Sequence, residues 1–139
     1  MTLSIRNQLP GTVTAVTPGE AMATVKVRLD GGQEITAAIT REAVDDLRLT
    51  EGSAVRTLVK STEIALATSP VEGLSVRNQL PGTVTGIAAG RAMTSVKVSV
   101  DGGELTAAIT TYAATDIGIS VGSSVVAVIK STEVSLATV

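Results

Sequence analysis

Apolar and polar residues alternate with a period of two along most of this chain. In the stretch 23–29, with the sequence ATVKVRL, every second residue is apolar, which is typical of a β-strand with one buried face. The residues Asp30-Gly31-Gly32 follow directly and predict a hairpin turn. A second turn is predicted at Pro10-Gly11. Further strands are predicted at 3–6, 11–16, 34–40, 55–60 and 63–67.

One segment of the first half departs from this alternation. Residues 41–47, with the sequence REAVDDL, place their apolar residues at helical spacing, and Thr40 precedes them as a candidate N-cap. A short helix is therefore predicted here. The second half contains a weaker version of the same signal near 111–117.

The chain contains one module twice. The segment that begins at Leu3 reads LSIRNQLPGTVT and the segment that begins at Leu74 reads LSVRNQLPGTVT, and more than half of the paired positions are identical. This repeat predicts a first module over 1–68, a linker over 69–73 that contains Pro and Gly, and a second module over 74–139. The expected fold is all-β and OB-like, with two tandem small antiparallel barrels that each carry one short helix.

Composition argues against a nucleic-acid partner. The formal net charge is -2, the sequence pI is about 5.1, and Tyr112 is the single aromatic residue. Binding to nucleic acid depends on a concentrated basic surface, and small barrels that bind single strands stack bases on aromatic side chains. An RNA-binding barrel is therefore disfavoured.

The absence of two residue types limits the chemistry further. The chain has no His and no Cys, which removes the thiolate nucleophile, the zinc finger and the side chain that titrates near neutral pH. We expect no enzymatic activity and no direct metal-cation ligands. No apolar stretch approaches the roughly 20 residues that span a bilayer, and the start of the chain lacks the apolar run of a signal peptide. A cytoplasmic protein without a membrane partner is expected.

Four polar residues recur at the two ends of each module, although charged positions elsewhere differ between the copies, as Glu20 and Arg91 do. Ser4 and Arg6 are two residues apart on a predicted strand, so their side chains are expected on one face. The recurring residues are Ser4, Arg6, Lys60 and Ser61 in the first module and Ser75, Arg77, Lys130 and Ser131 in the second.

These residues offer two cations and two hydroxyl donors per module, and the set is expected to contain no carboxylate. Such a set suits a tetrahedral dianion whose oxygens only accept hydrogen bonds, such as molybdate, tungstate or sulfate. Phosphate carries a proton at neutral pH and is better held where an acceptor is present, so the set disfavours it. The alternative is that Ser, Arg and Lys are ordinary solvated residues that protect an edge strand from pairing.

The motifs resemble a known family. The phrase S-x-R-N-x-L-x-G-T-V, the D-G-G turn, the helix start A-x-I-T-x-x-A and the terminal K-S-T-E occur in both copies. They are similar to the molybdenum-pterin-binding or Mop family, which includes the molbindins and the TOBE-type modules of molybdate transporters and regulators. Two tandem copies resemble the di-domain molbindins.

The resemblance implies a cytoplasmic protein that binds molybdate or tungstate for storage and homeostasis, without an organic cofactor. It implies a homo-oligomer, expected to be a trimer, with oxyanion sites between modules at the recurring Ser, Arg and Lys residues. It also implies an axial site lined by backbone at Gly19, Ala21 and Met22 and at Gly90, Ala92 and Met93.

Met22 and Met93 depart from the family pattern, which often has Asn at this position. A Met side chain cannot donate a hydrogen bond, so we interpret both residues as core or interface packing. The alternative function is a regulatory or interaction module that senses the anion and acts on a separate transporter or regulator chain.

Overall fold

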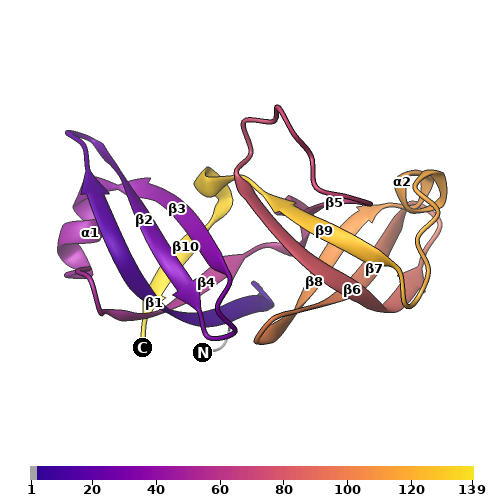
Figure 1. Cartoon of the computed structure of the whole chain (residues 1–139), viewed down its shortest axis with the longest axis horizontal. Helices are drawn as coiled ribbons and strands as arrows, with labels where there is room; N and C mark the ends of the chain where they lie inside the picture. The colour runs from indigo at the N-terminus through magenta and orange to yellow at the C-terminus, as the bar shows by residue number, and fades with distance from the viewer. Residues whose placement is uncertain (1–2) are drawn as a thin grey trace.

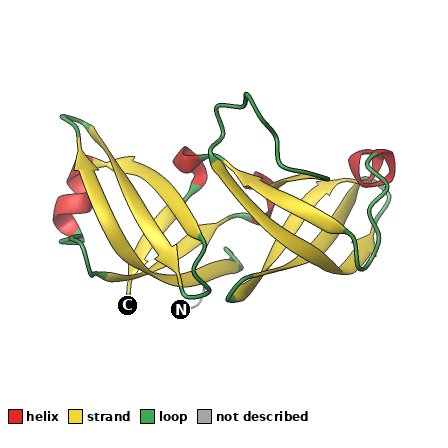
Figure 2. Cartoon of the chain, viewed as in Figure 1, coloured by secondary structure: helices red, strands yellow, loops and turns green. Residues whose placement is uncertain are grey.

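The computed structural model describes residues 3–139, which form two curled antiparallel β-sheets side by side, with one short α-helix at each outer end (Figure 1). Strands make up most of both halves (Figure 2). The first sheet has the order β10(Ser135–Thr138), β4(Ala54–Val59), β1(Asn7–Pro18), β2(Met22–Leu29) and β3(Glu34–Thr40). The second has the order β5(Ala65–Ala67), β9(Ser124–Ile129), β6(Asn78–Ala89), β7(Met93–Val100) and β8(Gly103–Thr110). The helices are α1(Arg41–Asp46), α2(Thr111–Asp116) and the 3-10 turns η1(Ser61–Glu63) and η2(Ser131–Glu133).

The period-two pattern is realised in the structure. Along β2, exposed and buried residues alternate without exception, so Val25 and Val27 lie in the core with no exposed surface. Thr40 caps α1 by accepting a hydrogen bond from the Ala43 N–H at 3.1 Å. The prediction of an all-β, OB-like fold of two tandem small antiparallel barrels, each with one short helix, is confirmed, and each barrel is formed by one curled five-stranded sheet.

The start of each module differs from the prediction. Leu3–Arg6 is not a strand, and Pro10-Gly11 is not a turn, because β1 runs unbroken from Asn7 to Pro18. Each sheet therefore has five strands rather than six. The Pro10 carbonyl accepts from the Asp30 N–H at 3.2 Å. The backbone polar groups of Pro10 thus face the β2–β3 hairpin, and the ladder to β4 loses no donor.

The two copies exchange their last strands. β5 belongs to the first copy by sequence but pairs with β9 of the second, and β10 of the second copy pairs with β4 of the first. Figure 1 shows β10 in yellow among the indigo and purple strands of the first half. The division at 1–68, 69–73 and 74–139 therefore describes the repeat in the sequence, and both sheets combine strands from the two repeats.

The tips of the two long hairpins also touch. A Cβ atom added to Gly31 would lie only 2.2 Å from the backbone carbon of Asp101, and one added to Gly102 would lie 2.4 Å from the Gly31 nitrogen. Glycine is needed at these positions because backbone meets backbone there. Gln33, which has no counterpart in the second copy, donates to the Pro81 carbonyl at 3.2 Å and adds a contact between the halves.

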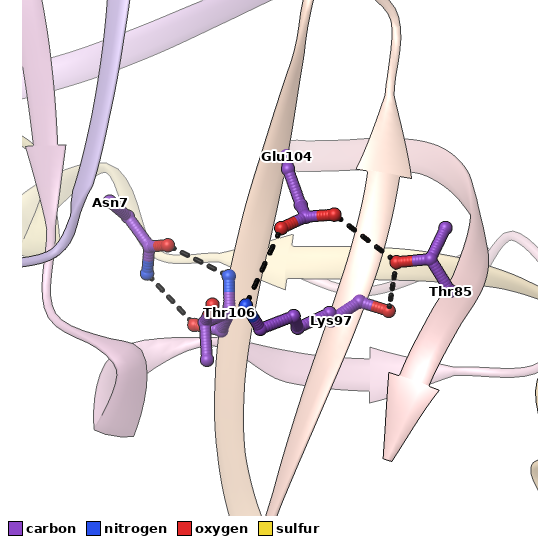
Figure 3. Close-up of polar contacts among 5 residues, drawn as sticks. All are labelled: Asn7, Thr85, Lys97, Glu104 and Thr106. Atoms are coloured by element: carbon purple, nitrogen blue, oxygen red, sulfur yellow. Dashed lines mark hydrogen bonds and ion pairs between the residues drawn. The ribbon is translucent and has the colours of Figure 1, made fainter.

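Two buried asparagines connect the halves reciprocally. Asn7 is 2% exposed, and its amide donates to the Thr106 carbonyl at 2.9 Å and accepts from the Thr106 N–H at 2.8 Å. Figure 3 shows this pair beside the β7–β8 hairpin. Asn78, which is 4% exposed, makes the same two bonds to Thr36, both at 2.8 Å. Each amide thus extends the free edge of β3 or β8 as a strand residue would.

Candidate functional site

The two ends of each module meet at one end of its sheet. Asn7 lies opposite Val59 at the end of the β1–β4 ladder, so Arg6 and Lys60 leave paired strands from the same end. The second copy repeats this arrangement, with Asn78 opposite Ile129. The strand pairing therefore supports the expected approach of the N-terminal Ser and Arg to the Lys-Ser pair. Since Ser4 and Arg6 precede the strand, their predicted placement on one strand face is wrong.

In the second copy three of the four recurring residues line a single surface hollow. Ser75, Lys130 and Ser131 enclose it together with Val76 and Thr132, and its volume is about 240 Å³. All its polar side chains are donors or hydroxyls, and no carboxylate lines it. Arg77 is exposed close by in sequence but is not among the lining residues.

The recurring lysine of each copy also lines a hollow that contains glutamates of both repeats. Lys130 lines one of about 470 Å³ together with Glu63 and Glu133. Lys60 lines a hollow of about 190 Å³ together with Glu63 and, from the other repeat, Glu133. Glu63 and Glu133 belong to the K-S-T-E segment of each copy, so the assumption that the recurring set contains no carboxylate is wrong. The sequence carried this signal, since both glutamates recur at the same position of the repeat.

The cations of the predicted sites are not neutralised by close ion pairs. The ion pairs within residues 3–139 join Arg41 to Asp45 at 4.0 Å and Lys97 to Glu104 at 3.8 Å. Across that part of the chain no carboxylate therefore lies within 4.0 Å of the recurring arginines and lysines. Arg6, Arg77, Lys60 and Lys130 are all exposed. These side chains keep their hydrogen-bond donors available for an anion from solution.

Unlike the exposed cations, Ser61 and Ser131 are held by hydrogen bonds within the protein. Both are half-buried, and each hydroxyl oxygen accepts from an asparagine amide: Ser61 from Asn7 at 3.5 Å and Ser131 from Asn78 at 3.4 Å. Sequence reasoning assigned no role to these asparagines. The sequence indicates a role for them only through their position directly after the recurring Arg in the repeated S-x-R-N phrase.

The predicted axial residues form tight turns between strands. The Gly19 N–H donates to the Met22 carbonyl at 2.8 Å, and the Gly90 N–H donates to the Met93 carbonyl at 2.9 Å. Both glycine N–H groups are therefore engaged within the turn. Ala21 and Ala92 use their carbonyls to accept from the first residue of α1 and of α2.

Both methionines of these turns are accessible to solvent. Met22 is 48% exposed and Met93 is 46% exposed, so the interpretation that they pack in the core is wrong. Met93 lines the hollow of about 470 Å³ that also contains Lys130, Glu63 and Glu133. Packing of the methionines at an interface between chains stays a prediction.

Within residues 3–139 no group of three or more Asp, Glu, His or Cys is arranged to hold a metal ion. The same range contains no helix long and apolar enough to cross a membrane.

Comparison with known proteins gives matches over nearly the whole chain. The TOBE domain model matches residues 3–66 and again residues 74–136. The chain is 38% identical over 136 residues to the molybdenum-pterin-binding protein MopB of Rhodobacter capsulatus, covering 96% of this chain and 50% of MopB. It is 36% identical over 138 residues to the molybdenum transport protein ModE of Azotobacter vinelandii, covering 99% of this chain and 51% of ModE. The chain thus spans about half the length of these curated relatives.

A solved structure resembles the entire chain. The cytoplasmic molybdate-binding protein ModG, crystallised with molybdate bound, superposes with a TM-score of 0.96 at 37% sequence identity, and the match covers 100% of both chains. The exchange of strands between the repeats and the position of the hollows therefore lie on a backbone shared with a protein whose ligand is a tetrahedral oxyanion.

Proposed function

The chain belongs to the TOBE domain family, whose model matches both of its repeats, and on that premise we propose that it is a molybdate-binding protein. The observation that carries the proposal is the hollow of Ser75, Lys130 and Ser131, on a backbone that follows molybdate-binding ModG along its whole length. The protein captures the anion reversibly and performs no covalent chemistry. Storage and homeostasis in the cytoplasm are the proposed purpose.

The oxyanion sites use the recurring residues at the module ends. Lysine and arginine neutralise the two negative charges, and the serine hydroxyls donate to the remaining oxygens, at about 1.5–3 kcal/mol for each hydrogen bond to a charged group. Tungstate has the same shape and charge and is expected to bind too. The residues are Ser4, Arg6, Lys60 and Ser61 in the first copy and Ser75, Arg77, Lys130 and Ser131 in the second.

The protein acts as a homo-oligomer, with a trimer as the expected state. The exposure of Met22 and Met93 supports burial of these side chains between chains, because large apolar side chains on a surface favour association. The turns at Gly19–Met22 and Gly90–Met93 would then lie close to the oligomer axis. A second kind of anion site there has to rely on backbone N–H groups other than those of the two glycines.

Thermal unfolding tests the proposal. An anion that binds only the folded protein stabilises it by RT ln(1 + [L]/Kd), about 2.7 kcal/mol at a hundredfold excess over Kd. For a molybdate site, molybdate is expected to raise the Tm more than sulfate does at equal concentration and ionic strength. Absence of a shift with millimolar molybdate and with millimolar tungstate would refute the proposal.

A second candidate function follows from the match to ModE. The chain matches about half of the molybdenum transport protein ModE, which favours a sensing module that acts on a separate regulator or transporter chain. Gel filtration of the chain with a purified molybdate transporter, with and without molybdate, distinguishes the two. Molybdate-dependent comigration supports sensing, and separate elution under both conditions supports storage.

A further inference from the structure

Asn7 and Asn78 use every hydrogen-bonding group of their side-chain amides. In Asn78 the oxygen accepts from the Thr36 N–H at 2.8 Å, and the nitrogen donates to the Thr36 carbonyl at 2.8 Å and to the Ser131 hydroxyl oxygen at 3.4 Å. An amide nitrogen has two hydrogens, so one hydrogen serves each acceptor. Asn7 repeats this set with Thr106 and Ser61. The recurrence on both sides makes this a feature of the module.

The two bonds from each asparagine amide to the threonine backbone are sufficient to link the two halves of the molecule. Thr36 lies on β3 of the first sheet and Thr106 on β8 of the second, and each pair of bonds closes the edge of one sheet with a side chain from the other repeat. The third bond goes to a half-buried serine of the same repeat as the asparagine. Ser131 lines the hollow of the proposed oxyanion site, and Asn78 does not.

The direction of this third bond determines what the serine can offer. A hydroxyl group has one hydrogen and two acceptor lone pairs. Because the amide donates, it occupies a lone pair of the serine oxygen and leaves the hydroxyl hydrogen free. A tetrahedral dianion presents only acceptors, so a serine prepared as a donor is complementary to it.

We propose that Asn7 and Asn78 are positioning residues that orient the Ser61 and Ser131 hydroxyls as donors to the bound oxyanion. This inference rests on the proposed function, because it concerns the same sites. It adds that the anion site is tied to the contact between the repeats, since one amide holds both the serine and the edge strand of the other repeat. Loss of the amide weakens anion binding through the serine and through no other residue.

A double-mutant cycle on the full chain tests this. Calorimetric titration with sodium molybdate compares wild type, Asn78→Ala, Ser131→Ala and the double variant, because coupled residues show non-additive effects. Each single variant is expected to weaken binding at the second-copy site about tenfold or more, and the double variant no further than Ser131→Ala. Gln33→Ala is the matched control. It removes the bond to the Pro81 carbonyl, another contact between the halves but one that involves neither Asn78 nor Ser131, and should change Kd less than about twofold.

The outcomes distinguish failure of the proposed function from failure of the positioning role. Failure of wild type to bind molybdate overturns the proposed function and this inference with it. Binding by wild type that Asn78→Ala leaves unchanged, or effects of Asn78→Ala and Ser131→Ala that add independently, overturn this inference alone.

A second measurement uses the wild-type fold and therefore decides the matter even if Asn78→Ala does not fold. The side-chain NH₂ resonances of Asn7 and Asn78 are followed by ¹⁵N NMR during a molybdate titration. They are expected to shift on binding in wild type, and in Ser61→Ala/Ser131→Ala they should not move at matched occupancy. Shifts that persist in that variant, or none in wild type with bound molybdate, contradict the positioning role.

Discussion

Arg6 and Arg77 are exposed side chains that the fold does not use, whereas Asn7 and Asn78 are buried and serve both fold and site. The sequence could identify the arginines because they recur while other charges drift. It could not show that Glu133 shares a hollow with Lys60, since that proximity arises only when the two repeats pack together. Nor could it show that the asparagines bridge the repeats, because spacing along a chain carries no information about contacts with another copy.

Replacing both arginines is expected to remove binding without harming the fold. In Arg6→Ala/Arg77→Ala the loss of charge-assisted hydrogen bonds should weaken molybdate binding about tenfold or more per site. Stability should change by less than about 0.5 kcal/mol, as is usual for exposed residues. Arg28→Ala, at an exposed strand position that is Ser99 in the other copy, is the control for loss of one positive charge. Unchanged stoichiometry and affinity in the double variant would show that the arginines are not ligands.

Strands and hairpins are where alternation predicted the structure best. The predicted strand 34–40 is β3 as observed, and the predicted helix 41–47 ends one residue early in α1. The prediction failed at Pro10. A Pro-Gly pair is typical of turns, but here the nitrogen of Pro10, which lacks a hydrogen, faces away from β4, so the strand can continue through it. The meeting of the hairpin tips at Gly31 and Gly102 also lay beyond reach, since a D-G-G turn explains its glycines without any neighbour.

Gly31→Ala tests the contact between the hairpin tips. Gly31 does not have positive φ, so alanine suits the local backbone, but its Cβ would lie 2.2 Å from the Asp101 backbone carbon. The tips must separate, and we expect a loss of about 1–3 kcal/mol in the free energy of unfolding, measured by urea denaturation. Gly86→Ala is the control. The nearest atom to its Cβ would be at 3.8 Å and the first copy has Ala15 there, so stability should hold or rise slightly. Equal stability of the two variants would contradict tip-to-tip packing.

The whole molecule is held together by exchange between the repeats. β10 completes the first sheet and β5 completes the second, so neither repeat contains a complete sheet of its own. The sequence could not reveal this exchange, because the closing strands are near copies and β4 and β9 are repeats of one another. Either closing strand therefore has the same apolar pattern to match either partner. The division into modules at 1–68 and 74–139 stays a prediction about folding units.

Deleting Ser135–Val139 tests whether β10 of the second repeat completes the sheet of the first. Because Ser135 to Thr138 pair with Leu58 to Val55, removal of β10 should expose the edge of β4 in the first sheet. Hydrogen exchange should accelerate in β4 far more than in β9. Deletion of Val139 alone, which lies beyond β10 and is 74% exposed, should leave both strands protected. Faster exchange in β9 with β4 unaffected would mean that the strands are not exchanged in solution.

Anomalous diffraction at the molybdenum absorption edge, from crystals grown with molybdate, locates the bound anion in the protein. We expect molybdenum peaks within hydrogen-bonding reach of Lys130 and Ser131 at the hollow that Ser75 also lines, and at the equivalent place by Lys60 and Ser61. Peaks confined to other surfaces, or no peak at either place while calorimetry reports binding, would contradict the proposed oxyanion sites.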